Sequence, residues 1–169
     1  MGVGKSTISK KLSKEFNMVA LDTDNLIESS HKKSIKEIFE ENGEKYFREQ
    51  EQKIANWIEN SVTNTIISTG GGFFMVENIK KIGTIVYLKS SYEDIMRRIM
   101  NHPNAKNKLL KRPLLADQKK AKELFRLREP KYLEIADIVV DFKNHKNIKN
   151  ILEEIVKYYK GKFDIMDTF

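Results

Sequence analysis

The first seven residues of this chain constrain its fold more than any other stretch. They read Met1-Gly2-Val3-Gly4-Lys5-Ser6-Thr7 and match the second half of a phosphate-binding loop, G-x-x-x-x-G-K-[ST]. In such a loop, backbone N–H groups and a helix N-terminus surround phosphate oxygens, while the Lys and the Ser or Thr serve phosphate and Mg²⁺. The opening glycine of the motif and its preceding strand would lie before Met1. We therefore expect a nucleotide-binding α/β protein whose written sequence begins inside its own motif.

The composition suits one domain and excludes several kinds of site. The chain has 169 residues, of which 40% are hydrophobic, so we expect a single domain over residues 1–160 followed by a tail at 161–169. Cysteine is absent, which excludes disulfides, thiolate metal sites and cysteine nucleophiles. We find no apolar run long enough to span a membrane and no signal peptide, so a cytoplasmic location is the expectation.

The formal net charge of +7 is spread along helices that mix Lys and Glu. Such charge usually lies on solvated helix faces, and it would equally suit a small anionic substrate. Nucleic-acid binding would need aromatic and basic side chains interleaved on one surface, a pattern that the sequence lacks. We therefore expect a monomer with small-molecule ligands, and neither a nucleic-acid nor a membrane partner.

Strand and helix patterns alternate along the chain. This order predicts parallel β-α units with helices on both faces of the sheet and ligands at the carboxyl ends of the strands. Pro130 is expected to close the helix that precedes it. The hydrophobic patterns predict strands at 18–21, 65–69, 84–88 and 138–141, and helices at 7–16, after the capping box at Ser34, at 44–60, at 76–82, after Ser91 to 100, at 121–127 and from 147.

Two of the predicted strands end in chemically distinctive residues. Asp22 and Asp24 follow the strand at 18–21, where open α/β sheets place their ligands, although Asp24 could instead cap the helix that follows it. Gly70 to Gly72 follow the strand at 65–69. One or two glycines suffice for a tight turn, so the third indicates the close approach of a ligand or another backbone. A simple turn is the alternative.

Two arginines and a polar loop are further candidates. Arg48 lies beside the apolar stripe of the helix at 44–60, but Glu44 and Glu51 at flanking spacing would also make it an ion-paired surface residue. Arg128, near a predicted helix end, would also fit an interaction with the helix dipole. Periodicity is lost from residue 101 to residue 111, which indicates either a lid over an active site or a solvated insertion.

Taken in order, these motifs resemble the shikimate kinase family over the whole chain except the tail. The family transfers the γ-phosphate of ATP to the 3-hydroxyl of shikimate, which gives shikimate 3-phosphate for aromatic amino-acid biosynthesis. The resemblance rests on Gly2-x-Gly4-Lys5-Ser6, Asp22-x-Asp24, Gly43-Glu44-x-x-Phe47-Arg48-x-x-Glu51, Gly70-Gly71-Gly72, Arg112-Pro113-Leu114-Leu115 and Arg128-x-Pro130-x-Tyr132.

The resemblance implies an α/β fold like that of nucleoside monophosphate kinases. Its parallel sheet has five strands, the first of which is missing from the written sequence, and helices cover both faces. The lid would lie at about 101–116 and the substrate-binding helices at about 24–60. If the chain truly begins at Met1, the sheet loses its central strand, and we expect poor stability and weak ATP binding.

The resemblance also implies roles for single residues. Lys5, Asp24 and Arg112 are expected to be catalytic: Asp24 accepts the attacking proton, and the two cations spread the developing charge. Arg48 and Arg128 would bind the shikimate carboxylate through paired N–H donors. The complete expectation is that ATP is bound by Gly2, Gly4, Lys5, Ser6, Thr7 and Arg112, Mg²⁺ by Ser6 and Asp22, and shikimate by Asp24, Arg48, Gly70, Gly71, Gly72 and Arg128.

Two other functions stay open at this point. A gluconate kinase would share the phosphate loop and the acidic pair, but it has no need for the glycine triplet with Arg48 and Arg128. A nucleotide-binding protein without catalysis is the second alternative. The segment between Arg98 and Arg112 is a few residues longer than is usual in the family, so we assign no adenine contact.

Overall fold

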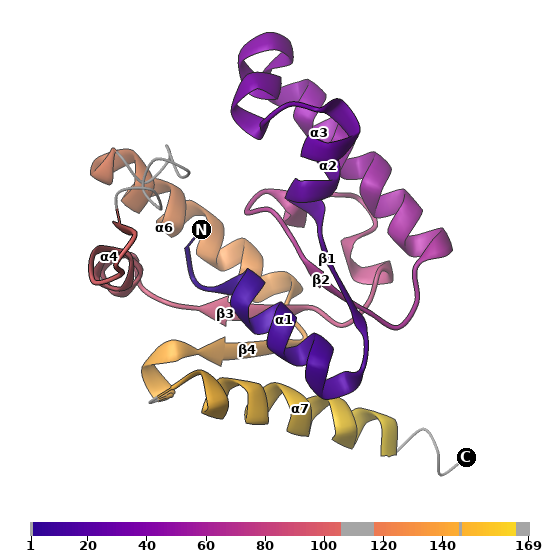
Figure 1. Cartoon of the computed structure of the whole chain (residues 1–169), viewed down its shortest axis with the longest axis vertical. Coiled ribbons are helices and arrows are strands. Elements are labelled where there is room, and N and C mark those ends of the chain that lie inside the picture. Colours follow the sequence, from indigo (N-terminus) through magenta and orange to yellow (C-terminus); the bar gives the residue numbers. More distant parts are fainter. Residues whose placement is uncertain (1, 106–116, 146, 165–169) are drawn as a thin grey trace. The chain divides into compact units, whose positions relative to one another are not determined.

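The computed structural model describes residues 2–105, 117–145 and 147–164, with side chains placed up to residue 161 (Figure 1). Its contacts divide the chain into two compact units. We call Lys5–Thr84 the N-terminal unit, and Met1–Gly4 with Ile85–Phe169 the C-terminal unit. The described residues form four strands in two parallel pairs, β1–β2 and β3–β4. Each pair lies within one unit, so each unit is an α/β structure with its own pair of parallel strands.

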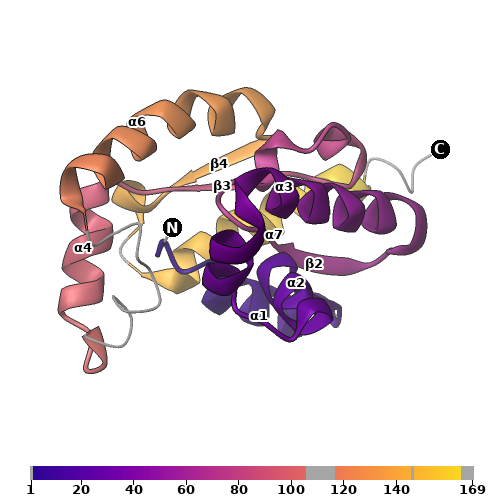
Figure 2. The ribbon, with the colours of Figure 1, turned by 90° about the horizontal axis from the view of Figure 1, so that it is seen from above.

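In the N-terminal unit, a helical crossover joins two parallel strands. Strand β1 (Val19–Asp22) pairs with β2 (Thr65–Ser68), so that Asp22 lies opposite Ser68. Helix α1 (Lys5–Phe16) contacts both strands, and α2 (Thr23–His31) with α3 (Ile35–Ser61) forms the crossover (Figures 1 and 2). The carboxyl ends of β1 and β2 therefore lie at one edge, as the alternating pattern predicts.

The local signals around α3 are confirmed. Ser34 caps its first turn, and the Glu37 side chain returns to the Ser34 backbone, which completes the predicted capping box. Gly43 breaks the helix with a φ of 80°, and the helix then resumes. Past the break, α3 buries Phe47 against Ile27 and Ile38, and farther along Ala55 and Ile58 pack with Phe73 and Val76.

The helix predicted at 76–82 is wrong. The segment instead forms two short 3₁₀ turns, η1 (Phe73–Met75) and η2 (Ile79–Lys81), separated by an extended Val76. Its apolar residues recur every third position at Phe73, Val76, Ile79 and Ile82, and all four belong to the cluster packed against α3. Three residues per turn is the 3₁₀ period, so this spacing places them on one face only in the tighter geometry.

The C-terminal unit repeats the parallel pairing. Strands β3 (Val86–Lys89) and β4 (Ile138–Asp141) pair in register, Val86 opposite Ile138. Helices α6 (Gln118–Ile135) and α7 (Ile148–Asp164) lie on opposite sides of this pair (Figures 1 and 2). Ser91 caps α4 (Tyr92–Met100), as its sequence predicts, and η4 (Phe142–Asn144) follows β4. The core of the C-terminal unit contains Val3, Tyr92, Ile95, Ile99 and Ala121.

Pro130 does not close a helix, contrary to the sequence prediction. It lies inside α6, which continues to Ile135. A proline there removes one backbone hydrogen bond, so the helix needs support from its surroundings. Glu129 supplies an ion pair with Lys89 of β3 at 3.0 Å. The ring of Tyr132 packs 5.1 Å from that of Tyr87, so the helix is attached to the strand on both sides of the proline.

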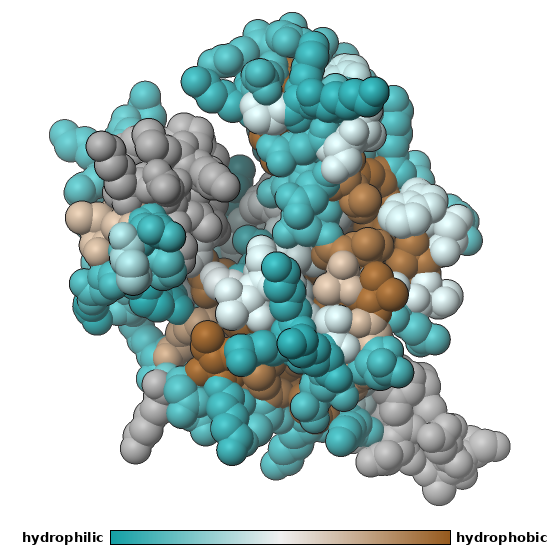
Figure 3. Space-filling model, in the orientation of Figure 1, coloured by the Kyte–Doolittle hydropathy of each residue, from teal (hydrophilic) through white to brown (hydrophobic). Residues whose placement is uncertain are grey.

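Surface charge follows the helical pattern expected from the sequence. Exposed ion pairs such as Lys36–Glu40 and Lys149–Glu153 join positions one turn apart. On the face shown in Figure 3, hydrophilic side chains predominate. Among the helices of the described residues, none combines the length and the apolar character that crossing a membrane requires.

Candidate functional site

The candidate site is built at the carboxyl end of β1, where Asp22 ends the strand and begins the next helix. One Asp22 carboxylate oxygen, Oδ1, accepts hydrogen bonds from the backbone N–H groups of Asp24 (3.1 Å) and Asn25 (3.3 Å). The alternative that Asp24 caps this helix is therefore wrong. Helix α2 begins at Thr23, so the capping position falls on Asp22, and Asp24 lies in the first turn with its carboxylate available for other contacts.

Asp24 has an unusual electrostatic environment. The pKa of its carboxyl group is raised to about 6, chiefly by burial and in smaller part by the nearby charges of Asp22, Glu51 and Glu28, while Lys5 opposes the shift. The carboxyl group is therefore mostly ionised at neutral pH and half-protonated near pH 6. A carboxylate with a pKa this close to the working pH suits a proton acceptor.

Gly70 leaves room for the Asp24 side chain. A Cβ atom at Gly70 would overlap the Asp24 carboxylate and would lie 3.2 Å from Glu51 Oε1. The Gly70 backbone N–H donates to Thr23 Oγ1 at 3.1 Å, and Thr23 is fully buried. This bond attaches the loop after β2 to the start of α2, and the absent side chain lets two carboxylates approach the loop backbone.

Arg48 projects from α3 between two acidic partners. Its Nε and Nη2 donate to Glu44 Oε1 at 3.2 and 2.8 Å, and its Nη1 donates to Glu51. The Arg48 side chain is 23% exposed and that of Glu51 only 2%. Burial disfavours the charge of Arg48, but the hydrogen bonds with Glu44 and Glu51 outweigh it and raise its pKa. The ion pairs with Glu44 and Glu51 that the sequence offered as the alternative for Arg48 are thus present, and one of the two partners, Glu51, is buried.

Gly72 leaves room for the Arg48 side chain, as Gly70 does for Asp24. A Cβ atom at Gly72 would overlap the guanidinium group, 2.6 Å from Cζ and 2.8 Å from Nη2. Its φ of −107° is open to any residue, so space and not backbone conformation requires the glycine. The sequence predicted the approach of a ligand or another backbone at the triplet. The groups that approach Gly70 and Gly72 are side chains of the same chain.

The start of α1 has the local geometry expected of a phosphate-binding loop. Gly2 and Gly4 have positive φ values of 69° and 103°. A Cβ atom at Gly4 would meet nothing within 4 Å, so its backbone conformation is what requires glycine. Ser6 and Thr7 lie exposed in the first turn of α1, a 12-residue helix whose N-terminus attracts anions.

The remaining predicted residues belong to the C-terminal unit or lie outside the described part. Arg128 belongs to the C-terminal unit, where it is half-buried on α6. Arg112 and most of the predicted lid lie outside the described residues. Lys5, Asp22, Asp24, Arg48 and the glycine triplet all belong to the N-terminal unit.

The donor set proposed for Mg²⁺ fits that ion in kind. Ser6 offers a hydroxyl and Asp22 a carboxylate, and Mg²⁺ is usually held by one or two protein oxygens with phosphates and water. The Oδ1 atom of Asp22 is engaged by the helix cap, which leaves Oδ2 for a metal. Among the described residues no group of three or more His, Cys, Asp or Glu could hold a metal by itself.

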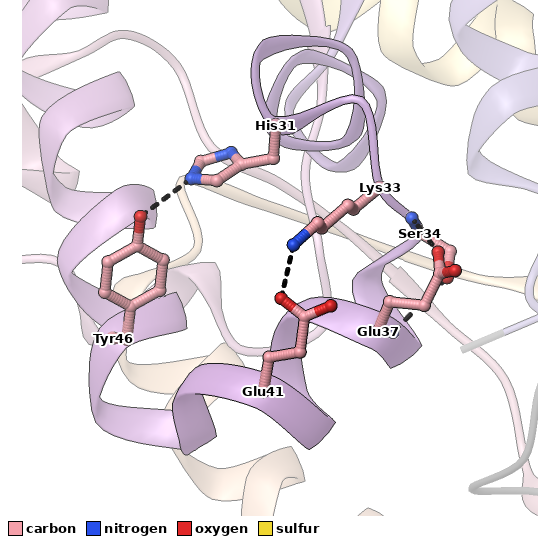
Figure 4. Close-up of polar contacts among 6 residues, drawn as sticks. All are labelled: His31, Lys33, Ser34, Glu37, Glu41 and Tyr46. Atoms are coloured by element: carbon pink, nitrogen blue, oxygen red, sulfur yellow. Dashed lines mark hydrogen bonds and ion pairs between the residues drawn. The ribbon is translucent and has the colours of Figure 1, made fainter.

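Hydrogen bonds between α2 and α3 hold the helices that carry Asp24 and Arg48 (Figure 4). His31 Nδ1 donates to the Ile27 carbonyl at 2.9 Å, so its Nε2 is left to accept from the Tyr46 hydroxyl at 3.0 Å. Lys33 pairs with Glu41 in the same link. The backbone N–H of Ile35 donates to Glu28 at 2.9 Å, so the site rests on a cross-linked helix pair.

Sequence reasoning assigned no function to three residues at this site. Thr23 lies between the two aspartates but resembles an ordinary strand-end residue. Glu51 belongs to the motif around Arg48, yet its burial could not be foreseen from its charge. Glu28 contributes to the pKa of Asp24 from one turn farther along α2. The sequence offers little to identify these three residues, because each acts through a contact that forms only in the folded chain.

Comparison with known proteins agrees with this geometry. The family model described as shikimate kinase matches residues 1–160. Shikimate kinase of Clostridium botulinum (strain Loch Maree / Type A3) is 39% identical over 161 residues, covering 93% of this chain and 90% of the relative. Shikimate kinase of Caldanaerobacter subterraneus subsp. tengcongensis is 37% identical over 166 residues, covering 94% and 91%.

A solved structure shows the same fold. Shikimate kinase from Acinetobacter baumannii in complex with shikimate superposes with a TM-score of 0.81 and 28% identity, covering 96% of this chain and 89% of that one. The parallel strands, crossover helices and phosphate loop are those of a P-loop kinase. Within that class, the chain belongs to the shikimate kinase family.

Proposed function

We propose that this protein transfers the γ-phosphate of ATP to the 3-hydroxyl of shikimate. The observation that carries the proposal is the cluster of half-buried Asp24 and Arg48 with buried Glu51 around the glycine triplet, at the edge where α/β sheets bind ligands. Family membership and the shikimate-bound structure of the Acinetobacter relative support the choice of substrate.

The chemistry begins with the hydroxyl group. Ionised Asp24 would accept a hydrogen bond from the attacking O–H and take its proton as the new oxygen–phosphorus bond forms and the bond to ADP breaks. The pKa of about 6 supports this role, because the carboxylate is ionised at neutral pH yet basic enough to receive the proton. Lys5, which is close enough to influence that pKa, would stabilise the transferring phosphoryl group.

Arg48 would bind the substrate carboxylate. Guanidinium carries five N–H donors, and Glu44 and Glu51 engage three of them. Two donors are left on the terminal nitrogens, a pair that matches a carboxylate. Arg128 would supply the second cation for that carboxylate, and the N–H groups of Gly71 and Gly72 would add main-chain donors.

The nucleotide side of the site follows the phosphate-loop motif. The positive φ values of Gly2 and Gly4 and the helix that follows support binding of the ATP phosphates there, with Ser6 and Thr7 at the helix start. Ser6 and Asp22 would hold Mg²⁺, which neutralises phosphate charge when bound. Arg112 is proposed to add a further positive charge. We expect the protein to act in the cytoplasm as a monomer.

A coupled assay of ADP release tests the proposal. Purified protein with ATP and Mg²⁺ should turn over shikimate and should leave gluconate unphosphorylated, because the glycine triplet with Arg48 and Arg128 matches the shikimate kinase family and is not needed by a gluconate kinase. Turnover of gluconate but not of shikimate would show that the protein is a gluconate kinase instead. Absence of turnover with either compound, combined with measurable ATP binding, would favour a nucleotide-binding protein without catalysis.

A further inference from the structure

A network of side-chain amides joins residues 70–78, which we call the glycine loop, to α3, the helix that carries Arg48. Gln52 Nε2 donates to Asn78 Oδ1 at 3.0 Å and to Asn56 Oδ1 at 2.8 Å, and its Oε1 accepts from the Glu77 backbone N–H at 2.9 Å. We call the Gln52–Asn78 pair the amide clasp. Gln52 lies one turn along α3 from Arg48, and Asn78 lies six residues beyond Gly72.

The amide clasp uses its polar groups completely. Asn78 Nδ2 donates to the Ala55 carbonyl at 3.2 Å and to Glu59 at 2.6 Å, while its Oδ1 accepts from Gln52. Asn78 is 8% exposed. Both amides need a donor and an acceptor at fixed places, so a carboxylate of the same shape would set oxygen against oxygen in a buried position.

The segment between Gly70 and the clasp is a chain of tight turns. Backbone hydrogen bonds run from Phe73 to Gly70 (3.3 Å), from Met75 to Gly72 (3.1 Å) and from Val76 to Phe73 (3.2 Å). Phe73, fully buried against α3, fixes the depth of this segment. Apolar packing has little directional preference, whereas the clasp fixes the register of the segment along the helix.

Register matters because Gly72 and the Arg48 guanidinium are in such close contact. A Cβ atom at Gly72 would already lie 2.6 Å from Arg48 Cζ. A shift of the loop along α3 by even a fraction of this distance would displace the guanidinium or separate it from the glycine backbone. The clasp is therefore in a position to control how the arginine is presented.

We infer that Gln52 and Asn78 are positioning residues for the acidic substrate: through the amide clasp they hold the glycine loop in the register that presents Arg48 to a carboxylate. This inference rests on the proposed function. It assigns the clasp an effect on substrate affinity and none on the nucleotide, because the contacts of the clasp run to α3 and to the loop after β2.

The experiment compares shape-conserving variants. Gln52→Glu and Asn78→Asp are each expected to raise the KM for shikimate about tenfold, equivalent to about 1.4 kcal/mol of lost binding. The KM for ATP and kcat should stay within about twofold. Asn60→Asp is the matched control, because Asn60 is an exposed amide on α3 that donates to the Asn56 carbonyl at 2.7 Å. Its KM for shikimate should not change.

A purely structural role would give different results. A loss of thermal stability with an unchanged KM for shikimate in folded Gln52→Glu protein would overturn the inference. Combining Gln52→Glu with Gly72→Ala should give less than the product of the two single effects on KM, since both act on Arg48. Fully multiplicative effects would contradict the coupling.

The proposed function and the inference fail in different ways. Wild-type protein that does not phosphorylate shikimate overturns both, whereas active wild type with unaltered clasp variants overturns the inference alone. If Asn78→Asp does not fold, Gln52→Glu at the less buried position decides the matter. Calorimetric titration of shikimate without ATP then gives the dissociation constant directly, and an unchanged constant in Gln52→Glu contradicts the inference.

Discussion

Strands β1 and β4 end alike, yet different residues follow their two ends. Asp22 and Asp141 each close a strand and cap the next turn, Asp141 by accepting from the Lys143 backbone N–H at 2.9 Å. After Asp22 comes a buried Thr23 and then Asp24 with its raised pKa. After Asp141 comes Phe142, beneath the guanidinium of Arg98 at 4.5 Å. The capping aspartate is thus part of the scaffold, and the next two residues decide what chemistry the strand end supports.

The largest effect is expected from removing the carboxylate that distinguishes the two strand ends. Asp24→Asn should lower kcat by about 10² to 10⁴-fold, because the attacking hydroxyl loses its proton acceptor. Steady-state kinetics with shikimate measure it. Asp141→Asn keeps a good capping residue and should leave kcat near wild type. Equal losses in both variants would mean that the strand ends do not differ in function.

The next largest difference is expected between Arg48, which lies near Asp24 at the candidate site, and Arg98, which lies over Phe142 after β4. Arg48→Lys removes the planar fork and is expected to raise the KM for shikimate by about 10- to 100-fold, the range for a lost charged hydrogen bond. Arg98→Lys, in the other unit, loses a stacking contact with Phe142 and should leave that KM unchanged. An Arg48→Lys protein with normal KM would remove Arg48 from the substrate site.

Gly72→Ala tests whether the space beside Gly72 serves substrate binding and not the stability of the fold. The new methyl group must displace the Arg48 guanidinium, which is the far end of a flexible side chain. We expect the KM for shikimate to rise about tenfold, with Tm within about 2 °C of wild type. Gly161→Ala in α7, where a Cβ atom meets nothing within 4 Å, is the control and should not alter KM. A large fall in Tm at Gly72 would show that the backbone, not Arg48, fills the space.

The last prediction concerns pH. The folded-state pKa of Asp24 is raised from 3.8 to about 6, so between these values the folded protein binds more protons than the unfolded chain. Relative to Asp24→Asn, wild-type stability should therefore fall as pH rises from 4 to 6 and then level off. In the same range kcat should increase as Asp24 ionises. Urea melts and rate profiles at several pH values measure both, and parallel stability curves for the two proteins would contradict the shift.

Local patterns predicted most of the fold. The four strands, the Ser34 and Ser91 caps and the break at Gly43 are encoded within a few residues each, so sequence reading placed them correctly. Pro130 was misjudged because its helix is supported by contacts with β3, which lies far away in sequence.

The candidate site shows the same limit. Asp24, Arg48 and the triplet stood out because their residue types are unusual at strand ends and helix faces. The amide clasp joins residues 26 positions apart, and a Gln and an Asn at that separation make no pattern. The reason for the third glycine was likewise hidden, since it depends on where Arg48 lies in the folded chain.

The space left by the triplet has a consequence for how this sequence can change during evolution. Gly72 and Arg48 share one volume, as do Gly70 and Asp24, so a side chain gained at the glycine displaces the functional group of its partner. A change at one position alone therefore moves the charged group out of its place. Paired positions of this kind should vary together or not at all, and a library randomised at 48 and 72 should return functional variants that keep glycine wherever arginine is kept.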